Sequence, residues 1–162
     1  MEKYLPEWDL SSLYASPEDP KVDQDLKELE GIDSFRSMYE GRLSSLSAQD
    51  FLSALKAYEK FETSMRKLYC YAYLIYSQEM NEDARVAFFQ KIRECLNEKS
   101  EGLVFFSLEL NHLSDAFLES AMQAEPALRI VGHQTSLESY QMEVFTGMYL
   151  CTLIFQQVFP GK

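Results

Sequence analysis

The sequence predicts an all-α fold, a long antiparallel helical hairpin or up-down bundle with an extended N-terminal lead-in. Apolar residues recur every three or four positions over three long stretches, and capping residues precede these stretches. No stretch alternates apolar and polar residues as a half-buried strand would. The chain has 162 residues, of which 46% are hydrophobic and 14% aromatic. It is therefore long enough to bury one sizeable core.

The lead-in covers residues 1–19, where Pro6, Pro17 and several Ser and Asp residues favour turns. Residues 20–128 form the predicted helical domain. Its first helix should begin at Pro20, because Asp19 can cap it and proline suits the first helical position. The apolar stripe comprises Val22, Leu26, Leu29, Phe35, Tyr39, Leu43 and Leu46. Its spacing is less regular around Gly31.

The second helix should begin after Ser47, where Ser-Ala-Gln-Asp resembles a capping box, and continue to about Gln78. Asn81 is the predicted cap of the third helix, whose stripe comprises Val86, Phe89, Ile92, Leu96, Leu103, Phe106 and Leu110. The short linker between these two helices predicts an antiparallel hairpin. A shorter helix should begin at Ser114 and end before Pro126.

Residues 129–162 form an atypical, charge-poor tail whose only charged residues are Arg129, Glu138, Glu143 and Lys162. A helix from about 136 to 158 is predicted there, with apolar residues all around its axis. The uncharged run 144–161 has an apolar part shorter than the roughly 20 residues that cross a bilayer. No membrane partner is therefore expected, and the first residues contain no apolar signal-peptide core.

Charge and cysteine content restrict the partners and the compartment. The formal net charge of −11 disfavours nucleic acid and anionic lipid, because both carry negative charge. Cys70, Cys95 and Cys151 are an odd number of widely spaced cysteines, which fits neither a disulfide framework nor a zinc ribbon. We expect reduced core thiols in a cytoplasmic protein.

The sequence contains no recognisable set of catalytic residues. His112 and His133 are the only histidines, neither belongs to a His-Glu-x-x-His motif, and both are predicted surface or capping residues. Phosphate-binding glycine loops and Gly-x-Ser-x-Gly are also absent. Glu94, Glu98 and Glu101 share one helix face, which favours a solvated acidic face; a carboxylate-bridged metal bundle is the alternative. We predict that this chain has no catalytic residue, metal site or cofactor of its own.

A tyrosine-rich segment is the remaining candidate for function. Tyr69, Tyr71, Tyr73 and Tyr76 lie within eight residues and cover more than one face of the predicted second helix. Tyrosine combines apolar area with a hydroxyl, which suits a peptide-contact or domain-contact surface. The alternative is that these rings pack between neighbouring helices and keep their hydroxyls at the rim.

Four short motifs occur in a fixed order along the chain. They are Trp8-Asp9-Leu10-Ser11-Ser12-Leu13-Tyr14 with Ser16-Pro17-Glu18-Asp19-Pro20, Tyr39-Glu40-Gly41-Arg42-Leu43, Leu68-Tyr69-Cys70-Tyr71-Ala72-Tyr73-Leu74 and Phe105-Phe106-Ser107-Leu108-Glu109-Leu110. In order and spacing they resemble the start of the oligoendopeptidase F-type zinc metallopeptidases, which are thimet-oligopeptidase-like. The resemblance covers about residues 4–128.

The resemblance implies a helical N-terminal domain that forms part of the wall around a channel for short peptides. In the full-length family, zinc and its His-Glu-x-x-His motif lie hundreds of residues further on, so no catalytic or zinc residue carries over to this chain. The expected partners are the missing catalytic domain, or a second copy through exposed apolar surface. After about residue 128 the chain departs from the family pattern, and a frameshift or premature stop would explain this departure. The alternative function is a stand-alone helical interaction module derived from the same scaffold.

Overall fold

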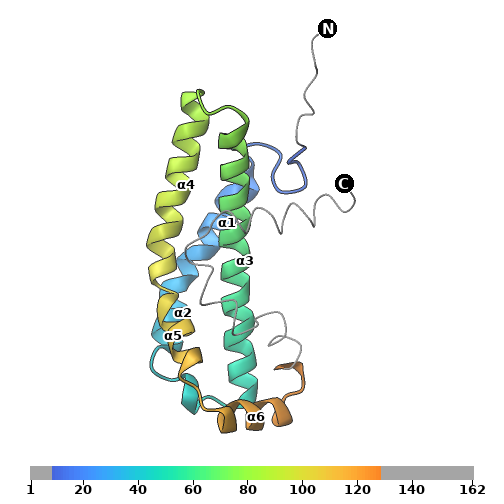
Figure 1. The fold of residues 1–162 in the computed structure, drawn as a ribbon, viewed down its shortest axis with the longest axis vertical. Coiled ribbons are helices and arrows are strands. Elements are labelled where there is room, and N and C mark those ends of the chain that lie inside the picture. Colours follow the sequence, from blue (N-terminus) through green and yellow to red (C-terminus); the bar gives the residue numbers. More distant parts are fainter. Residues whose placement is uncertain (1–8, 129–162) are drawn as a thin grey trace.

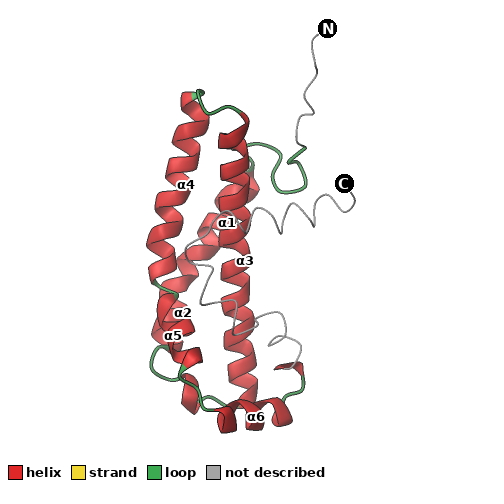
Figure 2. Ribbon diagram, viewed as in Figure 1, coloured by secondary structure: helices red, strands yellow, loops and turns green. Residues whose placement is uncertain are grey.

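The structure is a computed structural model that describes residues 9–128. Within this range the regular structure is helical and includes no strand (Figure 2), which confirms the all-α prediction. Its elements are α1 (Pro20–Glu28), η1 (Leu29–Gly31), α2 (Ile32–Tyr39), η2 (Leu43–Ser45), α3 (Ala48–Gln78), α4 (Asp83–Glu101), α5 (Val104–Asn111) and α6 (Asp115–Ala124). The predictions for the atypical tail and its helix at 136–158 lie outside the described residues.

The long helix α3 is the axis of the molecule, and α4 packs beside it in the opposite direction (Figure 1). The 31 residues of α3 span about 46 Å. Its predicted start is confirmed, because the Ser47 hydroxyl accepts a hydrogen bond from the Asp50 N–H at 3.1 Å. At the turn into α4, Arg85 donates to the side chains of Gln78 and Glu82. These contacts fix the tip of the hairpin.

The first helical stretch is divided into several pieces. Asp19 caps α1 as predicted, and its carboxylate accepts hydrogen bonds from the N–H groups of Lys21 and Ala15. The stripe toward Leu46 is not one continuous helix, however, because a 3₁₀ turn separates α1 from α2 and a corner follows α2. Leu29 and Ile32 at this turn are both fully buried. The irregular spacing of the apolar residues around Gly31 therefore corresponds to a change in the direction of the chain, which buries both residues.

The third predicted helix is also divided, at Gly102, into α4 and α5. A Cβ atom at Gly102 would lie only 2.6 Å from Cγ2 of Ile32. The absence of a side chain thus allows α2 to approach the backbone closely at this point. The predicted cap is wrong too: Glu82, not Asn81, precedes α4, and it makes no side-chain capping bond. Ser114, by contrast, caps α6 as predicted.

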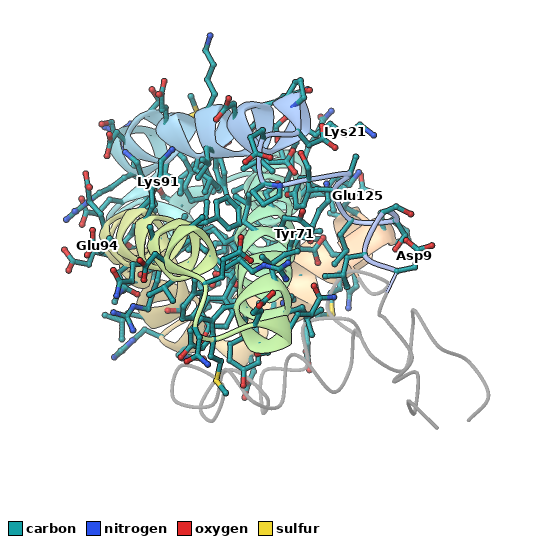
Figure 3. The ribbon with its side chains drawn as sticks, turned by 90° about the horizontal axis from the view of Figure 1, so that it is seen from above. Asp9, Lys21, Tyr71, Lys91, Glu94 and Glu125 are labelled. Atoms are coloured by element: carbon teal, nitrogen blue, oxygen red, sulfur yellow. The ribbon has the colours of Figure 1, made fainter. Side chains whose placement is uncertain are left out.

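Two groups of helices pack against α3 from different directions. On one face, aromatic rings of α6, α5 and α4 meet α3 in succession, in the pairs Phe51–Phe117, Tyr58–Phe106 and Tyr76–Phe89. On another face lie the lead-in, α1 and α2, in the pairs Tyr14–Tyr71 and Phe35–Phe61. Figure 3 shows α1 along one side of the α3–α4 pair, with Tyr71 between them. Among residues 9–128, no helix is long and apolar enough to cross a membrane.

Candidate interaction surface

Three of the four predicted tyrosines form one half-buried surface on the α3–α4 hairpin. Tyr69, Tyr73 and Tyr76 are spaced four and three residues apart, so their side chains project from the same face of α3. Phe89 and Arg93 of α4 are one turn apart and lie beside them. We call these five residues the tyrosine surface.

Phe89 is the centre of the tyrosine surface. Its ring centroid lies 5.9 Å from Tyr69, 6.0 Å from Tyr73 and 5.1 Å from Tyr76, and the Tyr76 ring is stacked on it at 16°. The guanidinium carbon of Arg93 lies 5.8 Å from the same centroid, within cation–π range. The four rings therefore hold one another in fixed positions while part of each ring remains accessible to solvent.

Tyr71 does not belong to this surface, which corrects the prediction for that residue. It is only 1% exposed, and its ring meets Tyr14 edge-to-face at 4.9 Å. Two residues along a helix correspond to a rotation of about 200°, so Tyr71 points away from Tyr69 and Tyr73. Burial, followed by the negative charges of Glu18 and Asp19, raises the pKa of Tyr71 above its ordinary value.

Tyr14 fastens the lead-in to the bundle through a second set of contacts. Its hydroxyl donates a hydrogen bond to Oδ2 of Asp25 at 2.5 Å, and Nζ of Lys67 donates to the same oxygen at 2.9 Å. Nζ of Lys67 also lies 4.1 Å from the centroid of the Tyr14 ring. We call Tyr14, Asp25 and Lys67 the clasp. The clasp was not predictable from the sequence, because its three members come from three separate elements.

The corner after α2 is held by a carboxylate from a distant helix. Glu109 of α5 accepts hydrogen bonds from the N–H of Gly41 at 2.6 Å and from the N–H of Leu43 at 3.4 Å. Gly41 has a φ of 75°, a conformation that residues with a side chain rarely adopt. This arrangement is a backbone concavity filled by an internal anion. It connects α5 to the corner that follows α2.

The residues considered for metal or nucleophilic chemistry are not members of the tyrosine surface. His112 is exposed, and its Nδ1 atom lies 2.7 Å from the carbonyl oxygen of Leu108. Among residues 9–128 no group of three side chains could hold a metal ion, and Glu94, Glu98 and Glu101 are all exposed. Cys70 is buried and Cys95 half-buried, and neither forms a disulfide among the described residues. His133 and Cys151 lie outside the described residues.

Comparison of the chain with protein-family models, with curated proteins and with solved structures gives no match.

Proposed function

We propose that this chain is the non-catalytic N-terminal helical domain, as a fragment or truncated product, of an oligoendopeptidase F-like zinc metallopeptidase that hydrolyses short peptides. In this role the bundle forms part of the channel wall and presents the tyrosine surface to the catalytic domain or to peptide. The zinc ion and its ligands belong to the catalytic domain. The proposed compartment is the cytoplasm, where the thiols stay reduced.

The observation that carries this proposal is that the motifs of the resemblance contact one another. Tyr14 of the first motif packs on Tyr71 of the third. Gly41 and Leu43 of the second motif donate hydrogen bonds to Glu109 of the fourth. Motifs that are individually short thus share one framework, as residues of an inherited scaffold would. Their contacts support a structural role for these residues.

A second candidate is a stand-alone helical interaction module that kept the scaffold. The completeness of the core favours it. Among the described residues no buried side-chain nitrogen or oxygen lacks a hydrogen-bond partner. Tyr14, Tyr71 and Phe106 are all nearly inaccessible to solvent. A bundle with a complete core does not need a second domain to fold, although it can still bind one.

A complementation experiment tests the proposed function. The full chain is mixed with the catalytic part of an oligoendopeptidase F-type enzyme that lacks its own N-terminal domain, and hydrolysis of a short fluorogenic peptide is followed. We expect a complex and a chelator-sensitive increase in turnover. Tyr73→Glu should reduce this increase, because it places a charge among the rings. Lys91→Glu is the matched control, since Lys91 is exposed and lies two positions after Phe89, on another side of α4.

Two outcomes would contradict the proposal. Absence of any complex, with both proteins folded, would favour the stand-alone module. Chelator-sensitive peptide turnover by the pure chain with zinc would show that the chain is itself an enzyme. Sequencing the locus beyond codon 162 gives an independent check: a downstream His-Glu-x-x-His coding segment, in any frame, is expected for a severed peptidase.

A further inference from the structure

We propose that residues 129–162 of this same chain occupy the tyrosine surface, so that the chain carries an internal cover for its contact site. The inference rests on the proposed function in that it uses the same surface. It adds the identity of the occupant and makes binding of a catalytic domain a competition with the chain's own C-terminal segment.

The tyrosine surface is partly accessible to solvent. Among the described helices, α1 lies along one side of the α3–α4 pair, the side on which Tyr71 lies (Figure 3). The helices α5 and α6 lie near the other end of α3, away from the α3–α4 turn (Figure 1). Tyr76 is close to that turn, and Tyr69, Tyr73 and Phe89 are half-buried. Half-buried aromatic rings suit an apolar occupant.

The composition of residues 129–162 favours burial against an apolar surface. Residues 129–162 carry only two positive and two negative charges but many large apolar side chains, among them Phe145, Tyr149, Leu153, Phe155 and Phe159. A segment of this kind exposes more apolar area than a protein in water tolerates, unless it is covered. Its charges cancel, so the strongly acidic remainder of the chain does not repel it.

Residues 129–162 begin near one end of α3 and are long enough to reach the tyrosine surface. The described part of the chain ends at Leu128, which is buried at 2% exposure just after α6. Phe117 of α6 contacts Phe51 near the start of α3 at 5.5 Å. From there to Tyr73 the helix rises about 33 Å, whereas 34 further residues can extend over roughly 110 Å. The segment therefore reaches the tyrosine surface easily.

The same connection favours the chain's own segment over that of a second copy. A tethered segment meets its site at an effective concentration in the millimolar range. A segment from another molecule competes at the far lower concentration of the protein in solution. Occupation within one chain is therefore the expected state of a dilute sample.

Paramagnetic NMR on the full chain tests the proposal. In a Cys95→Ser background, a nitroxide is attached to Cys151, because Cys70 is buried and protected from the reagent. We expect line broadening of the amides of Tyr73, Tyr76 and Phe89, with no broadening of Lys21 and Lys27 on α1. A second sample with Thr135→Cys and Cys151→Ser places the label in the other half of the segment. Absence of broadening at the tyrosine surface in both samples would overturn the proposal.

Two further samples complete the test. In the first sample, nitroxide-labelled chain without ¹⁵N is mixed with ¹⁵N-labelled chain that carries no nitroxide. We expect no broadening in this mixture. Broadening equal to that within the single chain would assign the occupant to a second copy and overturn the proposal. Tyr73→Glu should remove most of the broadening while circular dichroism still reports a helical fold, and Lys91→Glu should leave it unchanged. Broadening that survives Tyr73→Glu in full would contradict the proposed site.

The outcomes separate this inference from the proposed function. Broadening at the tyrosine surface without complementation of a catalytic domain would leave the inference standing and remove the proposed function. Complementation of a catalytic domain without broadening would leave the proposed function standing and remove the inference. If both hold, variants that weaken the internal cover without touching the surface, such as Phe155→Glu, should increase the affinity for the catalytic domain.

Discussion

Two faces of one tyrosine-rich stretch of α3 have different surroundings. On the face toward α1, Tyr71 is 1% exposed and packs against Tyr14, whose hydroxyl is bound within the clasp. On the face toward α4, Tyr69, Tyr73 and Tyr76 surround Phe89 and remain half-buried. The residue type is the same on both faces, so the neighbouring elements alone decide which tyrosine supports the fold and which ones are available for contact.

The largest expected difference between the faces concerns truncation of a ring. Tyr71→Ala should lower the free energy of unfolding by about 3–5 kcal/mol, because it opens a cavity in the core. Tyr73→Ala, the matched control, should cost only about 1 kcal/mol, since it removes ring contacts at a half-solvated site. Urea denaturation followed by circular dichroism measures both values. Equal losses would show that the two faces do not differ as described.

A smaller effect is expected from the clasp. Tyr14→Phe should lower the free energy of unfolding by about 1–2 kcal/mol, because the hydrogen bond to the Asp25 carboxylate is lost while the ring stays. Tyr39→Phe is the control, since the described residues include no hydrogen-bond partner for the Tyr39 hydroxyl. The change should also increase proteolysis within residues 9–19 under native conditions. If the two variants are equally stable, the clasp contributes nothing measurable.

The buried face also predicts a dependence on alkaline pH. Burial and the neighbouring Asp25 raise the pKa of Tyr14 above its ordinary value of 10.0, and burial raises the pKa of Tyr71 as well. The stability that comes from these protonated hydroxyls is complete below pH 10 and is lost as the pH rises above it. Urea midpoints at about pH 8 and about pH 10.5 should therefore differ. Tyr14→Phe should reduce the difference, and an unchanged difference would assign it to other groups.

The smallest effect on stability belongs to the half-buried face. Tyr73→Phe should change the free energy of unfolding by less than about 0.5 kcal/mol. The hydroxyl is nevertheless one of the polar groups that the tyrosine surface offers to a partner. Complementation of the catalytic domain should weaken in this variant although thermal and urea unfolding stay the same. A change in stability without a change in binding would reverse the roles given to the two faces.

Three of the helix starts were predictable because capping is local. Asp19, Ser47 and Ser114 each precede a helical stripe, and each accepts a hydrogen bond from an N–H two or three residues later. The break at Gly102 was not predictable in the same way. It depends on the approach of Ile32, which is 70 residues away in the sequence. A periodic stripe continues across such a break without any local sign of it.

The candidate surface was predictable in its residue type but not in its membership. Four tyrosines within eight residues exceed the width of one helix face, so at least one had to differ from the others. The sequence could not identify Tyr71 as that residue, because its burial depends on where the lead-in returns to α3. The contact of Glu109 with the corner at Gly41 was equally inaccessible, since no local pattern marks a carboxylate that binds a distant backbone.

The clasp also determines when the lead-in can pack against the bundle during synthesis of the chain. Tyr14 is made early, but Lys67 and Tyr71 follow more than 50 residues later. At the usual rate of about 5–20 residues per second, this separation corresponds to several seconds on the ribosome. Throughout that interval Tyr14, which is buried in the finished bundle, lacks the part of α3 that it packs against. The first segment of the described chain to be translated is therefore among the last to be fixed in place.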